Sequence, residues 1–257
     1  MEPIDKIKEI FKSYTDSYEK SSRTILKIRH TLRVADNCYE IAKSLNLSND
    51  DTVLAYLIGI CHDIGRFEQV KNFDSFNDKA CGIDHADYSN KVLFEDKLID
   101  KFSVDKSLHS LIKLAVYYHN KRDVPNNLSD RELLFCNIIR DADKLDILYA
   151  LITDSLEDLF WYDDFDVIKI SDEALETLYK EDLIPYSAVK TNADQIVVFY
   201  GYIFDLNFKK SYLKINHEKY YDIFTKRLYK KFSSKKLAKQ IEEINNYINN
   251  FIYNKIK

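Results

Sequence analysis

The sequence places a histidine and an aspartate side by side where an apolar segment ends. Residues 54–61 read Leu-Ala-Tyr-Leu-Ile-Gly-Ile-Cys, and His62 and Asp63 follow directly. We predict a buried helix here that stops near Gly65, because glycine readily adopts the left-handed conformation of a helix end. A buried carboxylate is costly unless it is paired or bound to a cation. Other parts of the chain are therefore expected to meet this pair.

A second inward carboxylate is predicted farther along the chain. Asp141 shares one helical face with four leucine or isoleucine residues, spaced three or four apart: Leu134, Ile138, Leu145 and Leu148. Asp143 and Asp146 fall off that face. A salt bridge to a core lysine or arginine is the ordinary explanation, but the opposing apolar stripes carry neither. We therefore interpret Asp141 as a metal ligand.

Three further histidines lie on apolar helical faces or near helix ends: His30, His85 and His119. A single histidine in such a place is more often a hydrogen-bonded core residue than a ligand. Here the histidines accompany His62, Asp63 and Asp141 in the same part of the chain, so a shared metal site is favoured. His109 and His217 lie off such faces, and we interpret them as surface or structural residues.

The helices that must position these residues follow from apolar periodicity and capping signals. Capping boxes are predicted at Ser48 with Asp51 and at Ser129 with Glu132. The predicted helices cover residues 4–18, 22–45, 50–63 and 84–101, followed by one that begins at 105 or 107 and one that begins at 129. A polar loop is predicted over residues 67–83, and a turn over residues 120–127.

The remainder of the chain, from about residue 161, is rich in aromatic residues and predicted to be mostly helical. Residues 193–206 form an apolar helix, and residues 237–252 form an amphipathic helix that packs on the core with a solvated basic face. Residues 167–170 are the one run that could form a short strand.

Composition bounds the class of protein. The 257 residues include 38 Lys or Arg and 42 Asp or Glu, and a net charge of −4 argues against nucleic-acid binding across the whole surface. We find no signal peptide and no transmembrane run, and expect a cytoplasmic protein with no membrane partner. The cysteines form no Cys-x-x-Cys pair, and we interpret them as reduced thiols: Cys38, Cys61, Cys81 and Cys136. We predict one all-α domain over residues 1–257, with a metal-binding core at about 22–150 and a helical extension at about 160–257.

The order of these residues resembles that of the HD-domain superfamily of metal-dependent phosphohydrolases. The family has a histidine on one helix, a His-Asp pair on another and a later aspartate, which match His30, His62 with Asp63, and Asp141. The local strings that carry the resemblance are Arg-His-Thr-Leu-Arg-Val at 29–34, Cys-His-Asp-Ile-Gly at 61–65 and Arg-Asp-Ala-Asp-Lys-Leu at 140–145. The resemblance covers roughly residues 22–150 and implies an HD-type helical bundle.

His85 and His119 match the two extra histidines of the subgroup that binds two metals. The resemblance implies that one ion takes His30, His62, Asp63 and Asp141, and that His85 and His119 take a second ion bridged by Asp63. Imidazole and carboxylate suit divalent iron, manganese, cobalt, nickel or zinc, with magnesium as a further option. Two such ions can activate a water molecule and clamp a phosphoryl oxygen.

The resemblance implies hydrolysis of a phosphomonoester or phosphodiester, with a nucleotide or another small phosphorylated molecule as the substrate. The Gly-Tyr-Pro signature of the cyclic-di-GMP enzymes is missing, which argues against that substrate. Arg66 directly follows the His-Asp-Ile-Gly segment, and Lys144 lies one turn beyond Asp141, so we predict both as phosphate contacts beside the catalytic Asp63.

Two other classes remain open. A di-iron oxygenase of the HD type uses the same ligands, and only metal identity and substrate separate it from a hydrolase. The third possibility is a non-catalytic ligand-binding module. The intact set of six metal ligands argues against it, because a module without catalysis has no need to keep them. The substrate and the oligomeric state do not follow from the sequence.

Overall fold

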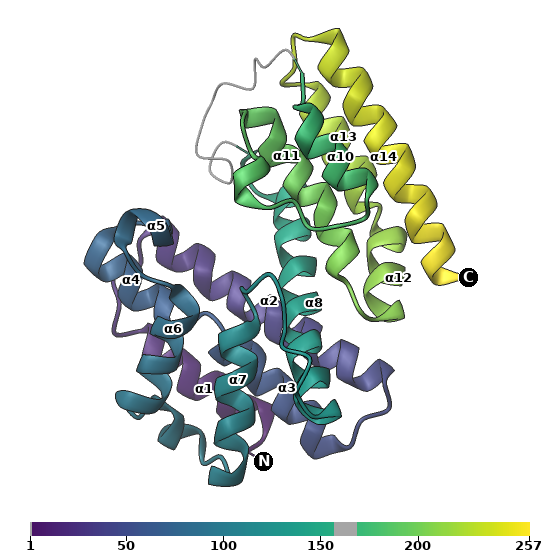
Figure 1. Cartoon of the computed structure of the whole chain (residues 1–257). Coiled ribbons are helices and arrows are strands. Elements are labelled where there is room, and N and C mark those ends of the chain that lie inside the picture. Colours follow the sequence, from purple (N-terminus) through teal and green to yellow (C-terminus); the bar gives the residue numbers. More distant parts are fainter. Residues whose placement is uncertain (1, 157–168) are drawn as a thin grey trace. The chain divides into compact units, whose positions relative to one another are not determined.

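A computed structural model describes residues 2–156 and 169–257 (Figure 1). Within these two ranges every regular element is a helix, which confirms the predicted all-α class. The chain divides into two compact units, Met1–Asp146 and Ile147–Lys257. The boundary lies close to residue 150, where we predicted the metal-binding core to end, while a single domain over the whole chain stays a prediction.

The first unit is built from helices of very different lengths. Their bounds are α1 (Ile4–Thr15), α2 (Ser22–Ser44), α3 (Asn49–Cys61), α4 (Gly65–Phe73), α5 (Asp78–Cys81), α6 (His85–Asn90), the π-helix η1 (Lys91–Glu95), the 3-10 helices η2 (Leu98–Phe102) and η3 (Lys106–Leu108), α7 (His109–Tyr118) and α8 (Asp130–Thr153). The last turns of α8, from Ile147, belong to the second unit. The capping signals are confirmed at two starts. Ser48 accepts the backbone N–H of Asp51, and Ser129 and Glu132 cap each other's backbone N–H groups reciprocally.

Helices α2 and α3 lie side by side with their backbones almost in contact. A Cβ atom at Gly59 would lie 2.6 Å from the Cα of Ala35 and 3.1 Å from the Sγ of Cys38, which is too close for any side chain. Glycine is therefore required where the two helices meet. This close approach brings His30, in the middle of α2, toward His62, the residue that follows α3.

Gly65 begins α4, so the prediction that it acts as a left-handed helix stop is wrong. Its actual constraint is space, because a Cβ atom there would lie 2.5 Å from the backbone N of Ser89 in α6. The predicted loop over residues 67–83 is also wrong, since α4 and α5 occupy most of it. Its polar composition misled the prediction: α4 buries the polar Gln69 together with Phe67 and Val70.

The helix predicted over residues 84–101 is interrupted. Asp84 caps α6 by accepting the backbone N–H groups of Ala86 and Asp87, so the start is as expected. The chain then continues as the π-helix η1, and Lys97 adopts a left-handed conformation with φ of 60°. A left-handed residue cannot continue a right-handed helix, so a separate 3-10 turn follows.

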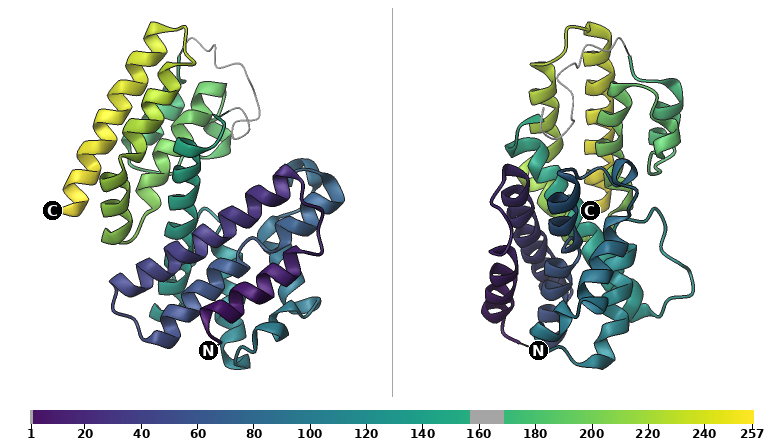
Figure 2. Two further views of the ribbon diagram at one scale, coloured as in Figure 1. Left: turned by 180° about the vertical axis from the view of Figure 1, so that it is seen from behind. Right: turned by 90° about the vertical axis from the view of Figure 1, so that its left-hand side faces the viewer.

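The second unit packs short helices against one long carboxy-terminal helix. The elements described in it are α10 (Asp172–Tyr179), η4 (Tyr186–Ala188), α11 (Asn192–Gly201), η5 (Tyr202–Asp205), α12 (Lys209–Glu218), α13 (Tyr220–Tyr229) and α14 (Lys235–Ile256). Helix α14 lies along α12 and α13, as both views of Figure 2 show. It buries five aliphatic residues spaced three or four apart: Leu237, Ile241, Ile244, Ile248 and Ile252. The predicted amphipathic helix is thus confirmed, with longer bounds.

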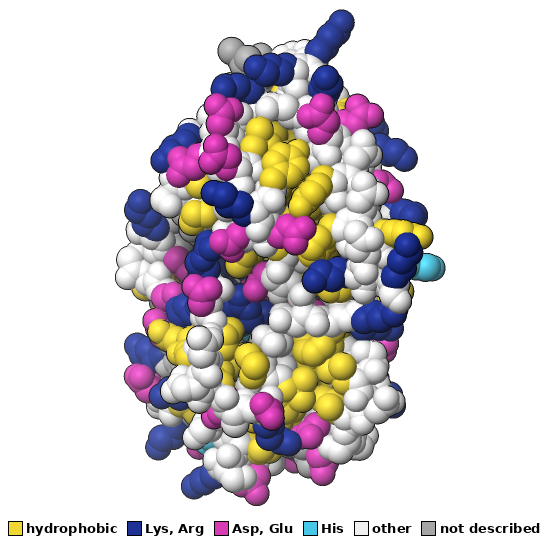
Figure 3. All heavy atoms as spheres, turned by 45° about the vertical axis from the view of Figure 1, so that its right-hand side comes forward, with side chains coloured by type: hydrophobic (Ala, Val, Ile, Leu, Met, Phe, Trp, Pro, Cys, Tyr) yellow, Lys and Arg dark blue, Asp and Glu magenta, His cyan; other side chains and the backbone are white. Residues whose placement is uncertain are grey.

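The predicted strand at residues 167–170 falls partly outside the described residues. Lys169 and Ile170, which are described, belong to no regular element. Within the described ranges, none of the helices is both long enough and apolar enough to cross a membrane. The four cysteines are free thiols, and three of them are buried: Cys38, Cys61 and Cys136. Acidic and basic side chains are intermixed on the face shown in Figure 3, in keeping with the small net charge.

Candidate metal centre

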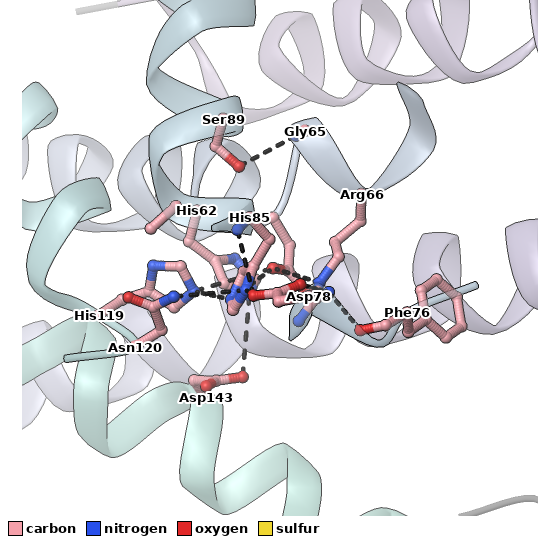
Figure 4. A network of polar contacts seen from close by, with 12 residues as sticks. His62, Gly65, Arg66, Phe76, Asp78, His85, Ser89, His119, Asn120 and Asp143 are labelled. Atoms are coloured by element: carbon pink, nitrogen blue, oxygen red, sulfur yellow. Dashed lines mark hydrogen bonds and ion pairs between the residues drawn. The ribbon is translucent and has the colours of Figure 1, made fainter. Parts of the chain in front are cut away.

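Four histidines from different parts of the first unit converge with their Nε2 atoms facing one another. Figure 4 shows three of them, His62, His85 and His119, close together. His30 lies within α2, His62 follows α3, His85 begins α6 and His119 follows α7. The Nε2 atoms of His30 and His62 are 3.3 Å apart, and those of His85 and His119 are 3.1 Å apart. The structure therefore brings together all four histidines that the sequence predicted as ligands.

The other ring nitrogen of each histidine has its own partner. Nδ1 of His62 donates to the carbonyl of Gly59 at 2.7 Å, and Nδ1 of His119 donates to the carbonyl of Val116 at 2.6 Å. A carbonyl can only accept, so in both residues Nδ1 carries the proton and Nε2 keeps its lone pair.

Carboxylates take the same role for the remaining two histidines. Nδ1 of His30 lies 2.7 Å from Asp146, and Nδ1 of His85 lies 2.5 Å from Asp78. Partners of this kind fix the tautomer and the orientation of metal-binding imidazoles. Four Nε2 atoms therefore face a common centre.

Asp63 lies between the two histidine pairs and presents a different oxygen to each. Oδ2 is 3.5 Å from His30 Nε2 and 3.7 Å from His62 Nε2. Oδ1 is 3.7 Å from His85 Nε2 and 3.8 Å from His119 Nε2, and it accepts no hydrogen bond although the residue is only 2% exposed. The Arg66 guanidinium forms an ion pair with this oxygen, but its Nε is 3.6 Å away, beyond hydrogen-bonding distance. A buried carboxylate oxygen without a hydrogen bond is costly, so its position favours a site for a cation.

The α8 carboxylate that approaches the Nε2 atoms of His30 and His62 belongs to Asp143, two residues after the predicted ligand Asp141. Asp143 Oδ1 is 3.2 Å from His30 Nε2 and 3.8 Å from His62 Nε2. Asp141 is fully buried, and its role as a ligand stays a prediction. On the distances to His30 and His62, we propose Asp143 as the α8 ligand. Helix α8 is buried on several faces around these residues, so one apolar stripe did not identify the side that faces the histidines.

The spacing of these atoms fits bound metal ions. Ligands held about 2.0–2.2 Å from an ion lie roughly 2.8–3.6 Å from one another in tetrahedral or octahedral geometry. In the first group, His30, His62, Asp63 and Asp143, these atoms lie 3.2 to 3.8 Å apart. In the second group, Asp63, His85 and His119, they lie 3.1 to 3.8 Å apart. Four imidazoles with two carboxylates form a donor set for a divalent transition metal.

Residues 28–148 match the family model of the HD domain, and this segment contains every ligand candidate described above. This segment is an HD domain. The match agrees with the predicted extent of roughly residues 22–150. Comparisons with curated proteins and with solved structures gave no match to this chain.

Burial lowers the pKa of His62, and burial together with His85 and His62 lowers the pKa of His119 to about 3. The surroundings of these two imidazoles in the HD domain therefore favour the neutral form. Burial and the Lys27 ammonium lower the pKa of His30, but hydrogen bonds to Asp143, Asp146 and Asp63 outweigh them and bring it to about 10. The surroundings of His30 thus favour a positive charge, which a divalent ion would supply.

Arg66 holds the carboxylate that orients His85 in the HD domain's second histidine pair, His85 and His119. Its guanidinium donates to Asp78 Oδ1 at 2.6 Å, to the carbonyl of Phe76 at 2.8 Å and to Gln69 at 2.7 Å. Asp78 in turn holds Nδ1 of His85 with its other oxygen. Figure 4 shows Arg66, Asp78 and His85 in this sequence. The structure gives Arg66 a positioning role, while its contact with a phosphate stays a prediction.

Two basic residues of α8, Arg140 and Lys144, are buried. Lys144 is buried, with 7% of its surface exposed, and its phosphate contact also stays a prediction. Arg140 donates to the backbone carbonyls of Tyr118, Lys121 and Arg122 and so holds the chain around His119.

Sequence reasoning missed three carboxylates of the site: Asp78, Asp143 and Asp146. The last two lie three residues apart, a spacing that puts them on the same side of a helix. That spacing was an available signal, because one imidazole can meet one carboxylate at each of its nitrogens, as His30 does. Asp78 lies in the segment predicted as a loop and carried no comparable signal.

Proposed function

We propose that this HD domain is a metal-dependent phosphohydrolase that cleaves a phosphomonoester or phosphodiester of a nucleotide or another small molecule. The position of Asp63 is the observation that carries the proposal, because its two oxygens face two separate histidine pairs. One carboxylate in this position can bridge two divalent ions, the arrangement that serves phosphoryl transfer in two-metal enzymes.

The residues divide between two sites. His30, His62 and Asp143 would hold one ion with Asp63 Oδ2, and His85 and His119 would hold the other with Asp63 Oδ1. Divalent ions bound here would lower the pKa of a water molecule and polarise a phosphoryl oxygen. The four imidazoles favour iron, manganese, cobalt, nickel or zinc over magnesium, which prefers oxygen ligands.

The surrounding residues fix the orientation of the four histidine rings without a bound substrate. Asp146 and Asp78 hold the Nδ1 protons of His30 and His85, and backbone carbonyls do the same for His62 and His119. Arg33 forms two hydrogen bonds to Asp146, at 2.5 and 3.0 Å, and thereby fixes the carboxylate that orients His30. Little side-chain reorganisation is then needed for the ligands to act together.

Metal analysis followed by a substrate panel tests the proposal. Protein purified without chelator should contain about two transition-metal ions per chain. With manganese or cobalt it should release product without oxygen from p-nitrophenyl phosphate, bis(p-nitrophenyl) phosphate or one of a panel of nucleotides. Asp63→Ala should abolish both metal binding and turnover. Asp74→Ala, at a carboxylate that is 77% exposed, is the matched control and should change neither.

Two outcomes would replace the proposal. Product formation that requires both iron and oxygen, with no phosphate or alcohol released from any ester, would assign the domain to the di-iron oxygenases. Tight nucleotide binding without turnover under any metal would make it a ligand-binding module.

A further inference from the structure

Lys27 lies at the edge of the metal centre, outside the ligand set. Its Nζ donates to Asp63 Oδ2 at 2.7 Å, and its side chain is 14% exposed. It precedes His30 by one turn of α2, so the two side chains lie on the same side of the helix. Lys27 also lies just before residues 28–148, the segment that matches the HD domain.

The oxygen that Lys27 contacts is the one that faces His30 and His62. An ion held by those imidazoles would therefore share Asp63 Oδ2 with the ammonium group. A divalent ion draws negative charge from this oxygen and repels a second cation nearby, so the bond between Lys27 and Asp63 weakens when the ion is bound. The ammonium group then needs another anionic partner within its reach.

Nearby arginines are already held by several acceptors. Arg66 is bound by Asp78, Gln69 and the carbonyl of Phe76, and Arg33 is bound by both oxygens of Asp146. Among the described residues, Lys27 by contrast has Asp63 as its one hydrogen-bond acceptor. Its other contact is the ring of Phe76, whose centroid lies 5.2 Å from Nζ and which holds the ammonium group through a weaker attraction.

We propose that Lys27 binds a phosphoryl oxygen of the substrate beside the ion held by His30, His62, Asp63 and Asp143. This inference rests on the proposed phosphohydrolase function and adds the residue that recognises the substrate's charge. Lysine is suited to the task because its ammonium group is a mobile point charge on a flexible stem. In this arrangement Lys27 exchanges one anion, Asp63, for another, the phosphoryl group.

Replacement of Lys27 by methionine and by arginine tests the proposal. The control is Lys43→Met, at an exposed position on the same helix. Three quantities are measured: KM and kcat on the best substrate found, calorimetric binding of inorganic phosphate to the manganese-loaded protein, and manganese bound per chain at limiting metal concentrations. Lys27→Met should raise KM and weaken phosphate binding by about ten- to a hundredfold, the usual effect of losing one charge-assisted hydrogen bond. Lys27→Arg should restore part of the phosphate binding, and Lys43→Met should match the wild type.

Metal affinity separates this role from a purely structural one. Because Lys27 competes with the ion for Asp63 Oδ2, Lys27→Met should bind manganese at least as tightly as the wild type. Weaker manganese binding with unchanged phosphate binding per loaded site would overturn the proposal, since Lys27 would then only hold Asp63 in place. Absence of phosphoesterase activity in the wild type would instead count against the proposed function, and phosphate binding to the loaded protein still decides the role of Lys27.

Discussion

Asp143→Asn should weaken binding of the first metal ion, because among the described contacts it removes the one α8 carboxylate that approaches the Nε2 atoms of His30 and His62. Loss of a residue that merely orients a ligand costs about 10–100-fold in metal affinity, so loss of a direct ligand should cost about 100-fold or more. At saturating manganese this factor removes about 2.7 kcal/mol of metal-induced stabilisation. A protein of this size gains about 2–4 °C in Tm per kcal/mol, so the rise in Tm caused by manganese should shrink by about 5–11 °C.

The assay is thermal unfolding of chelator-treated protein over a manganese titration, for wild type, Asp143→Asn and Asp141→Asn. The quantity compared is the rise in Tm caused by the metal, so that any loss of stability in the metal-free variants cancels. Asp141→Asn can lower the starting Tm, since Asp141 is fully buried, but it should keep the metal-induced rise. A normal rise in Asp143→Asn with a lost rise in Asp141→Asn would refute our assignment and restore Asp141 as the ligand.

Two further predictions concern residues that support the site. Asp78→Asn should lower the affinity for the second ion by about 10–100-fold, because Asp78 holds Nδ1 of His85. Elemental analysis should then find about one ion per chain instead of two, and two ions bound at wild-type affinity would contradict this. Gly65→Ala should lower the free energy of unfolding in urea by about 1–3 kcal/mol, since the added Cβ would lie 2.5 Å from the backbone of Ser89. Gly201→Ala should cost less, because its Cβ would come closest to the flexible end of Ile184, at 3.3 Å, and would lie at ordinary contact distance from the nearest backbone atom. Equal urea midpoints for the two glycine variants would show that α4 can shift away from α6 freely.

The parts of the fold that the sequence predicts well are those governed by local rules. The helix after Ser48 and the helix after Ser129 begin where their capping groups require, and the aliphatic stripe of α14 identifies its buried face. The His62–Asp63 pair is recognisable because a costly carboxylate follows an apolar helix. These features depend on neighbours within a few residues.

The errors arise where distant packing decides. Helix α8 is buried on several sides, so the apolar stripe around Asp141 gave no unique inward direction and did not reveal that Asp143 faces His30. Gly65 looked like a helix stop, but its reason for being glycine is Ser89, 24 residues away in the chain. Helix α4 was missed because it buries the polar Gln69 beside Phe67 and Val70, so its sequence has no purely apolar stripe.

The contacts of His30 with Asp143 and Asp146 also connect two helices that are far apart in the chain. His30 on α2 and Asp146 on α8 are separated by 116 residues, and Asp143 approaches the same ring from its other nitrogen. An ion bound by His30 and Asp143 would therefore act as a cross-link that closes a loop containing most of the first unit. Neither α2 nor α8 could then detach alone without releasing the ion. Hydrogen exchange should consequently slow in both helices together when metal is added, even at amides far from the ligands.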